Sequence, residues 1–203
     1  MIRMRHLMAG CVAVALAACA SAPVHYYTLI PAPENTQTGN TAPTANFQFE
    51  LMPVGVPAQD DVPQLVVRQG GQSVAMLDGE RWIAPLADEV RGALSVDLSR
   101  QMNAQDVSSG VGVDGKPVLR IKVDLRRFDS SPGNYALIDA TWTIRALKGP
   151  AVITCNSRIN QSVGQGYEGL VAAHQQALST LAGQIASVAP AVATGSVAAC
   201  PAG

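Results

Sequence analysis

The spacing of apolar residues changes several times along the chain, and each spacing predicts a different element. Between Pro85 and Met102, apolar side chains recur every fourth residue, with acidic and basic residues between them. This period places the apolar side chains on one face of an α-helix, and Pro85 suits its first turn. A second helix is predicted from about Tyr167 to Val188, because an Ala- and Leu-rich amphipathic stretch there runs up to Pro190.

Alternation of apolar and polar residues predicts three long strands, at 118–128, 135–147 and 152–163. Short Gly- and Pro-containing segments join them, so we expect an antiparallel meander. The fold class that the whole pattern predicts is α+β: a single, mostly antiparallel sheet with two amphipathic helices packed on one face.

Shorter strands are predicted nearer the N-terminus, where β-branched and aromatic residues gather at 24–30 and 47–51. Residues 65–68 and 74–77 flank a Gly-Gly pair, which is typical of a hairpin. The Asp-Gly pair at 78–79 predicts that the chain turns again directly after the hairpin.

Residues 1–18 have the layout of a secretory signal peptide. Arg3 and Arg5 precede an apolar segment from Leu7 to Ala18. Twelve helical residues span only about 18 Å, which is too short for a hydrocarbon core of roughly 30 Å. We therefore expect this segment to be cleaved, and the alternative is an uncleaved anchor.

The sequence Leu16-Ala17-Ala18-Cys19 resembles a bacterial lipobox, in which the cysteine thiol takes up a diacylglyceryl group. We expect Cys19 to become the acylated first residue, carrying diacylglycerol and palmitate. Ala20, rather than aspartate, then implies delivery to the outer membrane, with the protein on its periplasmic face. An ordinary signal-peptidase site near an unmodified Cys19 is the alternative.

The predicted mature chain divides into three parts. Residues 19–25 form a lipidated tether, residues 26–190 form one domain that includes a polar loop at 31–46, and residues 191–203 form a tail. Removing the signal leaves more acidic than basic residues, which argues against binding to nucleic acid. No apolar run after Cys19 reaches the 18 residues of a membrane-spanning helix.

Cys155 and Cys200 are the cysteines that remain beyond the acylated residue. An even pair in an exported protein predicts a disulfide, since the periplasm permits one. The alternative is a buried free thiol at Cys155 and an unstructured end around Cys200.

Motifs for chemistry are absent from the sequence: it has no HExxH, CxxC, GxSxG or phosphate-binding glycine loop. We therefore expect no metal, no cofactor and no enzymatic activity. His174 lies on the apolar stripe of the second helix, where a core or edge histidine is expected rather than a catalytic one. Asp60 and Asp61 lie in a Pro-flanked loop and are expected to be solvated.

Basic residues concentrate on one face of the 118–128 strand, with one further arginine next to them in the sequence. The alternating pattern gives either an ordinary solvated face or a docking patch for an acidic partner or anionic lipid head groups. The residues concerned are Arg120, Lys122, Arg126 and Arg127.

Two segments suggest a family. Tyr26-Tyr27-Thr28-Leu29 follows the lipobox closely, and Arg81-Trp82-Ile83-Ala84-Pro85-Leu86 opens the first helix. From Cys19 to about Ala189, the chain resembles the ABC-type transport auxiliary lipoproteins of the PqiC or YmbA type. We expect structural roles for the motif residues, with Trp82 as an aromatic wedge between helix and sheet; they are Tyr26, Tyr27, Leu29, Arg81, Trp82, Pro85 and Leu86.

The resemblance implies a non-enzymatic outer-membrane lipoprotein that serves an intermembrane lipid transport system. Its implied partners are an MCE-domain periplasmic protein, an inner-membrane permease and an ATPase, and a homo-oligomer is compatible with the sequence. The rival interpretation is a structural periplasmic lipoprotein that braces an envelope complex unrelated to transport.

Overall fold

The computed structural model describes residues 23–33, 44–110, 112 and 115–202. Cys19, most of the tether and most of the polar loop lie outside the described residues. The elements follow one another as β1 (His25–Tyr27), β2 (Gln48–Leu51), β3 (Gln64–Gly70), β4 (Ser73–Trp82), α2 (Leu86–Met102), β5 (Val118–Ser131), β6 (Tyr135–Ala146), β7 (Val152–Ser162) and α3 (Gly166–Ala193).

The α+β class and the antiparallel β5–β6–β7 meander are confirmed, but the single, mostly antiparallel sheet is wrong. The strands form two mixed sheets, ordered β1-β4-β3 and β2-β5-β6-β7. The short strand β1 runs parallel to β4, and the short strand β2 runs parallel to β5. Alternation shows which residues share a face, but it does not show which distant strand a short segment will join.

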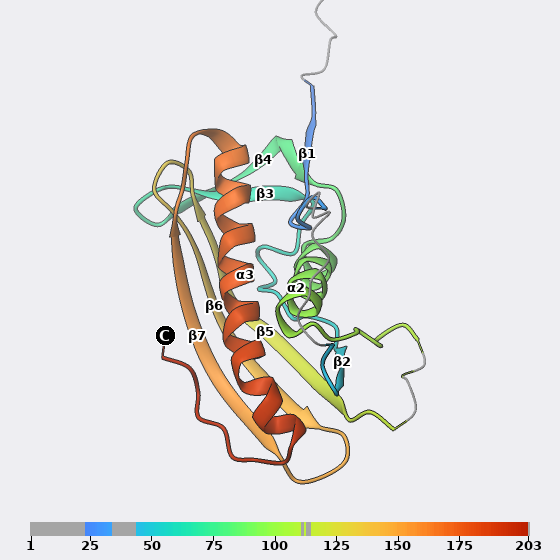
Figure 1. Cartoon of the computed structure of the whole chain (residues 1–203). Coiled ribbons are helices and arrows are strands. Elements are labelled where there is room, and N and C mark those ends of the chain that lie inside the picture. The colour runs from blue at the N-terminus through green and yellow to red at the C-terminus, as the bar shows by residue number, and fades with distance from the viewer. Residues whose placement is uncertain (1–22, 34–43, 111, 113–114, 203) are drawn as a thin grey trace, which may run out of the picture.

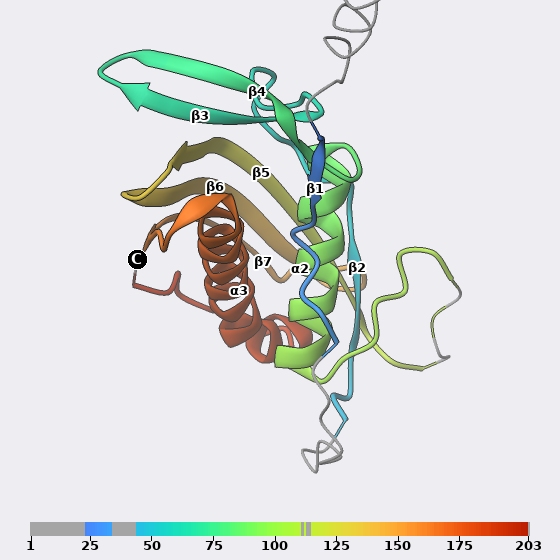
Figure 2. The same ribbon diagram turned by 90° about the horizontal axis from the view of Figure 1, so that it is seen from above.

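The large sheet carries helix α3 along its core face, and α2 packs against α3 (Figure 1). The β3–β4 hairpin forms a second layer beside β5, on the far side from α3 (Figure 2). The main core lies between the large sheet and the two helices, and its fully buried side chains include Trp142, Ile121, Leu94 and Leu181.

Three element ends differ from expectation. No turn occurs at Asp78-Gly79, because β4 continues to Trp82 with β1 and β3 as its neighbours. Pro85 is the cap residue before α2, and its carbonyl accepts the first backbone hydrogen bonds of the helix. Pro190 lies inside α3, which continues to Ala193, since burial of the last turn outweighs the hydrogen bond that proline cannot make.

A β-bulge interrupts β5 directly after Leu125 and resets the alternation of the strand. Without it, Arg127 and Asp129 would share the core face with Leu125. With it, Phe128 and Ser130 face the core, whereas Arg127 and Asp129 lie on the opposite face. The bulge therefore brings two charged side chains of β5 under the β3–β4 hairpin.

Candidate functional site

A pocket of about 320 Å³ lies between the β3–β4 hairpin and the end of β5. Its apolar lining includes Val74 and Met76 of β4. Its charged lining consists of two arginines and two aspartates, one pair on β5 and the others on β3 and the preceding loop: Asp60, Arg68, Arg127 and Asp129.

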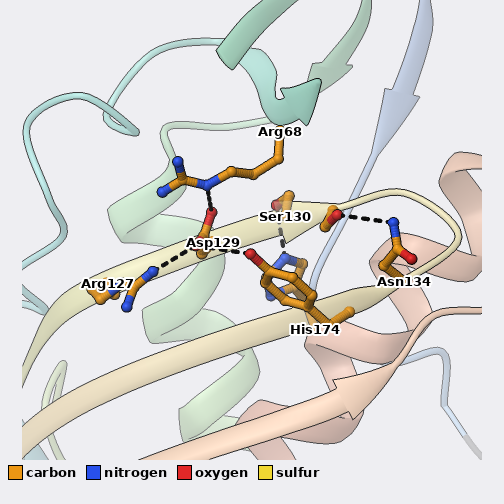
Figure 3. A network of polar contacts seen from close by, with 8 residues as sticks. Arg68, Arg127, Asp129, Ser130, Asn134 and His174 are labelled. Carbon is orange, nitrogen blue, oxygen red and sulfur yellow. Dashed lines mark hydrogen bonds and ion pairs between the residues drawn. The ribbon is translucent and has the colours of Figure 1, made fainter. Parts of the chain in front are cut away.

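Asp129 is the centre of the polar network in Figure 3. Its carboxylate accepts hydrogen bonds of 2.7 Å from Nε of Arg68 and 2.7 Å from Nη2 of Arg127, with the Tyr135 hydroxyl at 3.4 Å. Burial pushes the pKa of Asp129 up, but the hydrogen bonds and charges of the two arginines outweigh it and hold the pKa below its usual value. Asp129 thus joins the hairpin to the large sheet as a carboxylate.

Asp60 is the other carboxylate of the pocket, and the expectation that it is solvated is wrong. Only 8% of its surface is exposed, whereas the neighbouring Asp61 is exposed. Burial, with a further contribution from the charge of Asp129, raises the pKa of Asp60 to about 6, although Arg68 acts in the opposite direction. The described part of the chain gives this side chain no hydrogen-bond donor.

Replacing Asp60 with asparagine is expected to stabilise the protein at pH 8 and to leave its stability unchanged at pH 4. The pKa of Asp60 is higher in the folded protein than in the unfolded chain. The contribution of protonated Asp60 to stability is therefore fully present below the unfolded pKa of 3.8 and is lost as the pH rises through about 6. The full pKa shift of Asp60 corresponds to about 3 kcal/mol in the free energy of unfolding. Screening by water in the open pocket should reduce this to about 2 kcal/mol.

Urea denaturation at both pH values would measure this difference, with Asp61→Asn as the control at the exposed neighbour. A stabilisation by Asp60→Asn that is equal at pH 4 and pH 8 would contradict the account, because it could not come from ionisation of Asp60.

His174 is a core histidine, as expected from its place on the helical stripe. It is fully buried, stacks on Phe128 with ring centroids 3.9 Å apart, and its Nε2 lies 2.9 Å from the Ser130 hydroxyl. Its Nδ1 atom has no hydrogen-bond partner in the described structure. Burial lowers the pKa of His174 to about 3, so the ring is neutral at physiological pH.

Trp82 contacts the same phenylalanine as His174 does. Its ring meets Phe128 edge to face, with centroids 6.1 Å apart, and its side chain is buried. Trp82 belongs to the small sheet, Phe128 to the large sheet and His174 to α3. The three rings therefore connect both sheets to the helix, and Phe128 also lines the polar pocket.

The Tyr-Tyr-Thr-Leu segment is fixed to the domain by two glutamates that sequence reasoning did not single out as contacts. The Tyr27 hydroxyl donates to Glu80 at 2.6 Å, and the backbone N–H of Leu29 donates to Glu89 at 2.7 Å. Leu29 is fully buried in the core, whereas Tyr26 is 60% exposed. The segment holds the start of the domain against β4 and α2.

The second motif forms the corner between β4 and α2. Arg81 donates from Nε to the backbone carbonyl of Asp78 at 3.0 Å, Pro85 caps the helix, and Leu86 is buried in the core. These contacts define the positions of the motif residues without bringing them into the pocket.

Each basic residue of the predicted docking patch has a carboxylate partner. Arg120 pairs with Glu50 at 2.9 Å, Lys122 with Asp124 at 3.0 Å, Arg126 with Asp139 at 2.6 Å and Arg127 with Asp129 at 2.7 Å. The four partners balance the positive charge of this surface. A docking role for it stays a prediction.

The structure joins Cys155 of β7 to Cys200 by a disulfide, with Cα atoms 5.6 Å apart. The tail after α3 is therefore linked to the edge strand of the large sheet. Within the described residues, no helix combines the length and apolar character needed to cross a membrane.

Comparisons with known proteins agree with this architecture. A crystal structure of an uncharacterized protein matches with a TM-score of 0.63 and 19% identity, covering 82% of this chain and 98% of that chain. Protein XCC0632 from Xanthomonas campestris, assigned to the DUF330 family model, matches with a TM-score of 0.58 and 16% identity, covering 81% of this chain and 94% of that chain. Both likenesses show the fold. A search of curated protein sequences gave no match.

The family model for the ABC-type transport auxiliary lipoprotein component matches residues 27–186. The match begins within Tyr-Tyr-Thr-Leu, includes the corner at Trp82 and ends within α3. The chain belongs to the ABC-type transport auxiliary lipoprotein family.

Proposed function

We propose that the protein is a non-enzymatic accessory of an intermembrane lipid transport system, anchored by acylated Cys19 in the periplasmic leaflet of the outer membrane. There it receives the end of the conduit formed by an MCE-domain protein, which an inner-membrane permease and an ATPase serve. The family match over residues 27–186 is the observation that carries this proposal.

The position of β1 supports a location close to the membrane. This strand begins at His25, and the Tyr27, Leu29 and Glu89 contacts fix the chain to the domain directly afterwards. The six Cα–Cα steps from Cys19 to His25 reach about 20 Å at most in a fully extended chain. An acylated Cys19 would therefore hold the β1–β4 edge near the bilayer surface and leave the rest of the domain facing the periplasm.

The outer face of the large sheet is our choice for the docking surface. It presents the balanced ion pairs of Arg120, Lys122 and Arg126, and such alternating charges favour a partner with a matching pattern over an anionic membrane. Lys122 is the most exposed of the three cations, with 62% of its side chain accessible.

Affinity purification of the full-length protein from detergent-solubilised envelopes tests the proposal. The MCE protein and the permease are expected to co-purify. Lys122→Glu should weaken recovery of the MCE protein, whereas Lys148→Glu, an exposed residue in the β6–β7 turn, should not. Recovery of a different envelope complex without any MCE protein would contradict the proposal and favour a structural lipoprotein.

A further inference from the structure

The pocket between β3, β4 and β5 combines charges of both signs with an apolar wall. Asp60 and Asp129 supply two negative charges, and Arg68 and Arg127 supply two positive charges. Asp129 is paired with both arginines, so the two guanidinium groups and Asp60 remain the groups that a ligand can contact.

Asp60 is the strongest sign of a ligand. A carboxylate buried to this degree is normally paired or hydrogen-bonded, because burial of an unpartnered charge is costly. Its carboxylate lines the open pocket and accepts no hydrogen bond from the described residues, so the charge of Arg68 is the one favourable interaction found for it there. A cationic N–H group in the pocket would supply the missing partner.

Both arginines of the pocket keep N–H donors that Asp129 does not use. Each guanidinium has five N–H donors, and Asp129 accepts from one nitrogen of each. The side chains of Arg68 and Arg127 are 32% and 42% accessible. Guanidinium groups with remaining donors are well suited to phosphate.

The β4 side of the pocket is apolar and open. Val74 and Met76 line it and are 54% and 62% exposed, although both are large apolar side chains. Ligand pockets range from about 300 to 1,000 Å³, so the pocket of about 320 Å³ fits a small polar group. An apolar chain attached to that group could extend over Val74 and Met76.

We propose that this pocket binds the headgroup of a zwitterionic phospholipid, with the ammonium on Asp60, the phosphate on Arg68 and Arg127, and the chains leaving over Val74 and Met76. The inference rests on the proposed function, which brings the domain to lipid, and deepens it by naming the headgroup. A free ammonium–phosphate metabolite has the same polar chemistry but makes no use of the apolar wall.

Calorimetric titration of the full-length acylated protein in a non-ionic detergent tests the proposal at pH 7.5. The probes are dihexanoyl phosphatidylethanolamine, the soluble headgroup compound glycerophosphoethanolamine, and dihexanoyl phosphatidylglycerol, which lacks the ammonium. We expect the phosphatidylethanolamine to bind at least tenfold more tightly than either of the other two.

The variants separate the contributions. Asp60→Asn should weaken phosphatidylethanolamine binding at least tenfold, while Asp61→Asn at the exposed neighbour should leave it unchanged. Since Asp60→Asn is also expected to raise stability, loss of binding cannot be ascribed to misfolding. Met76→Gln should weaken binding of dihexanoyl phosphatidylethanolamine but not binding of glycerophosphoethanolamine. The affinity of the wild-type protein for dihexanoyl phosphatidylethanolamine should fall as the pH drops below about 6, because Asp60 is then protonated.

Equal binding by Asp60→Asn and wild type, or no preference for phosphatidylethanolamine over phosphatidylglycerol, would overturn the proposal. Equal affinity for glycerophosphoethanolamine would overturn the lipid assignment in favour of a soluble metabolite. Co-purification of the MCE protein with Asp60→Asn reports on the proposed function separately, so failure of one can be told from failure of the other.

Discussion

Replacing Cys200 with serine is expected to lower the free energy of unfolding by about 4 kcal/mol. The disulfide to Cys155 closes a loop with a sequence separation of 45 residues, and the chain-entropy model assigns a stabilisation of this size to such a loop. For a domain of this length, the melting temperature should fall by roughly 8–16 °C. Thermal unfolding followed by circular dichroism would measure the shift.

The control for this prediction is wild-type protein treated with a reductant. Its melting temperature should equal that of the Cys200→Ser variant, because both lack the same cross-link. The reductant should leave the melting temperature of the variant unchanged. Two free thiols in the native exported protein, or equal melting temperatures for variant and oxidised wild type, would contradict the predicted contribution.

Acid is expected to destabilise the protein through His174 by about 3 kcal/mol between pH 7.5 and pH 4.5. The folded-state pKa of His174 is lowered to about 3, so the unfolded chain takes up the proton first as the pH falls below 6.5. The contribution of His174 to stability is therefore intact above pH 6.5 and decreases towards pH 3. Urea denaturation at the two pH values would measure the loss.

A double variant isolates this effect. His174→Phe with Ser130→Ala removes both partners of the buried hydrogen bond and keeps a ring stacked on Phe128. Between pH 7.5 and pH 4.5, the free energy of unfolding of the double variant should fall by about 3 kcal/mol less than that of wild type. The carboxylates of Asp60 and Asp129, whose pKa values are also shifted, are present in both proteins, so their contributions cancel. Ser130→Ala alone should keep the wild-type pH dependence.

The sequence was sufficient for the elements that are defined by local periodicity. The helix after Pro85 and the meander from Val118 onward were predicted from spacing alone, because each buries one face against a neighbour. Pairing between distant segments was not predictable in this way. Strands β1 and β2 are too short for their pattern to reveal that each joins a parallel partner far along the chain.

The same limit applies to Glu89 on α2. Apolar residues at intervals of four describe only the centre of the buried stripe, which an α-helix extends to positions three residues away. Glu89 lies on that wider stripe and is buried there to hold Thr28 and Leu29. A three-and-four count along the helix would have marked it as a buried polar residue.

The pocket was missed for a different reason. Its charged residues come from a loop, from β3 and from β5, and the bulge after Leu125 determines which side chains of β5 point to it. Strict alternation would have placed Asp129 in the core. Asp60 could have been noticed only as a carboxylate between prolines, which gives no indication of burial.

Separation of inner and outer membranes from cells that produce wild type or Cys19→Ser tests the central claim most directly. The account predicts that wild type sediments with the outer membrane and incorporates labelled palmitate, whereas Cys19→Ser carries no label and leaves the outer-membrane fraction. An unlabelled wild-type protein, or identical fractionation of the two proteins, would contradict it.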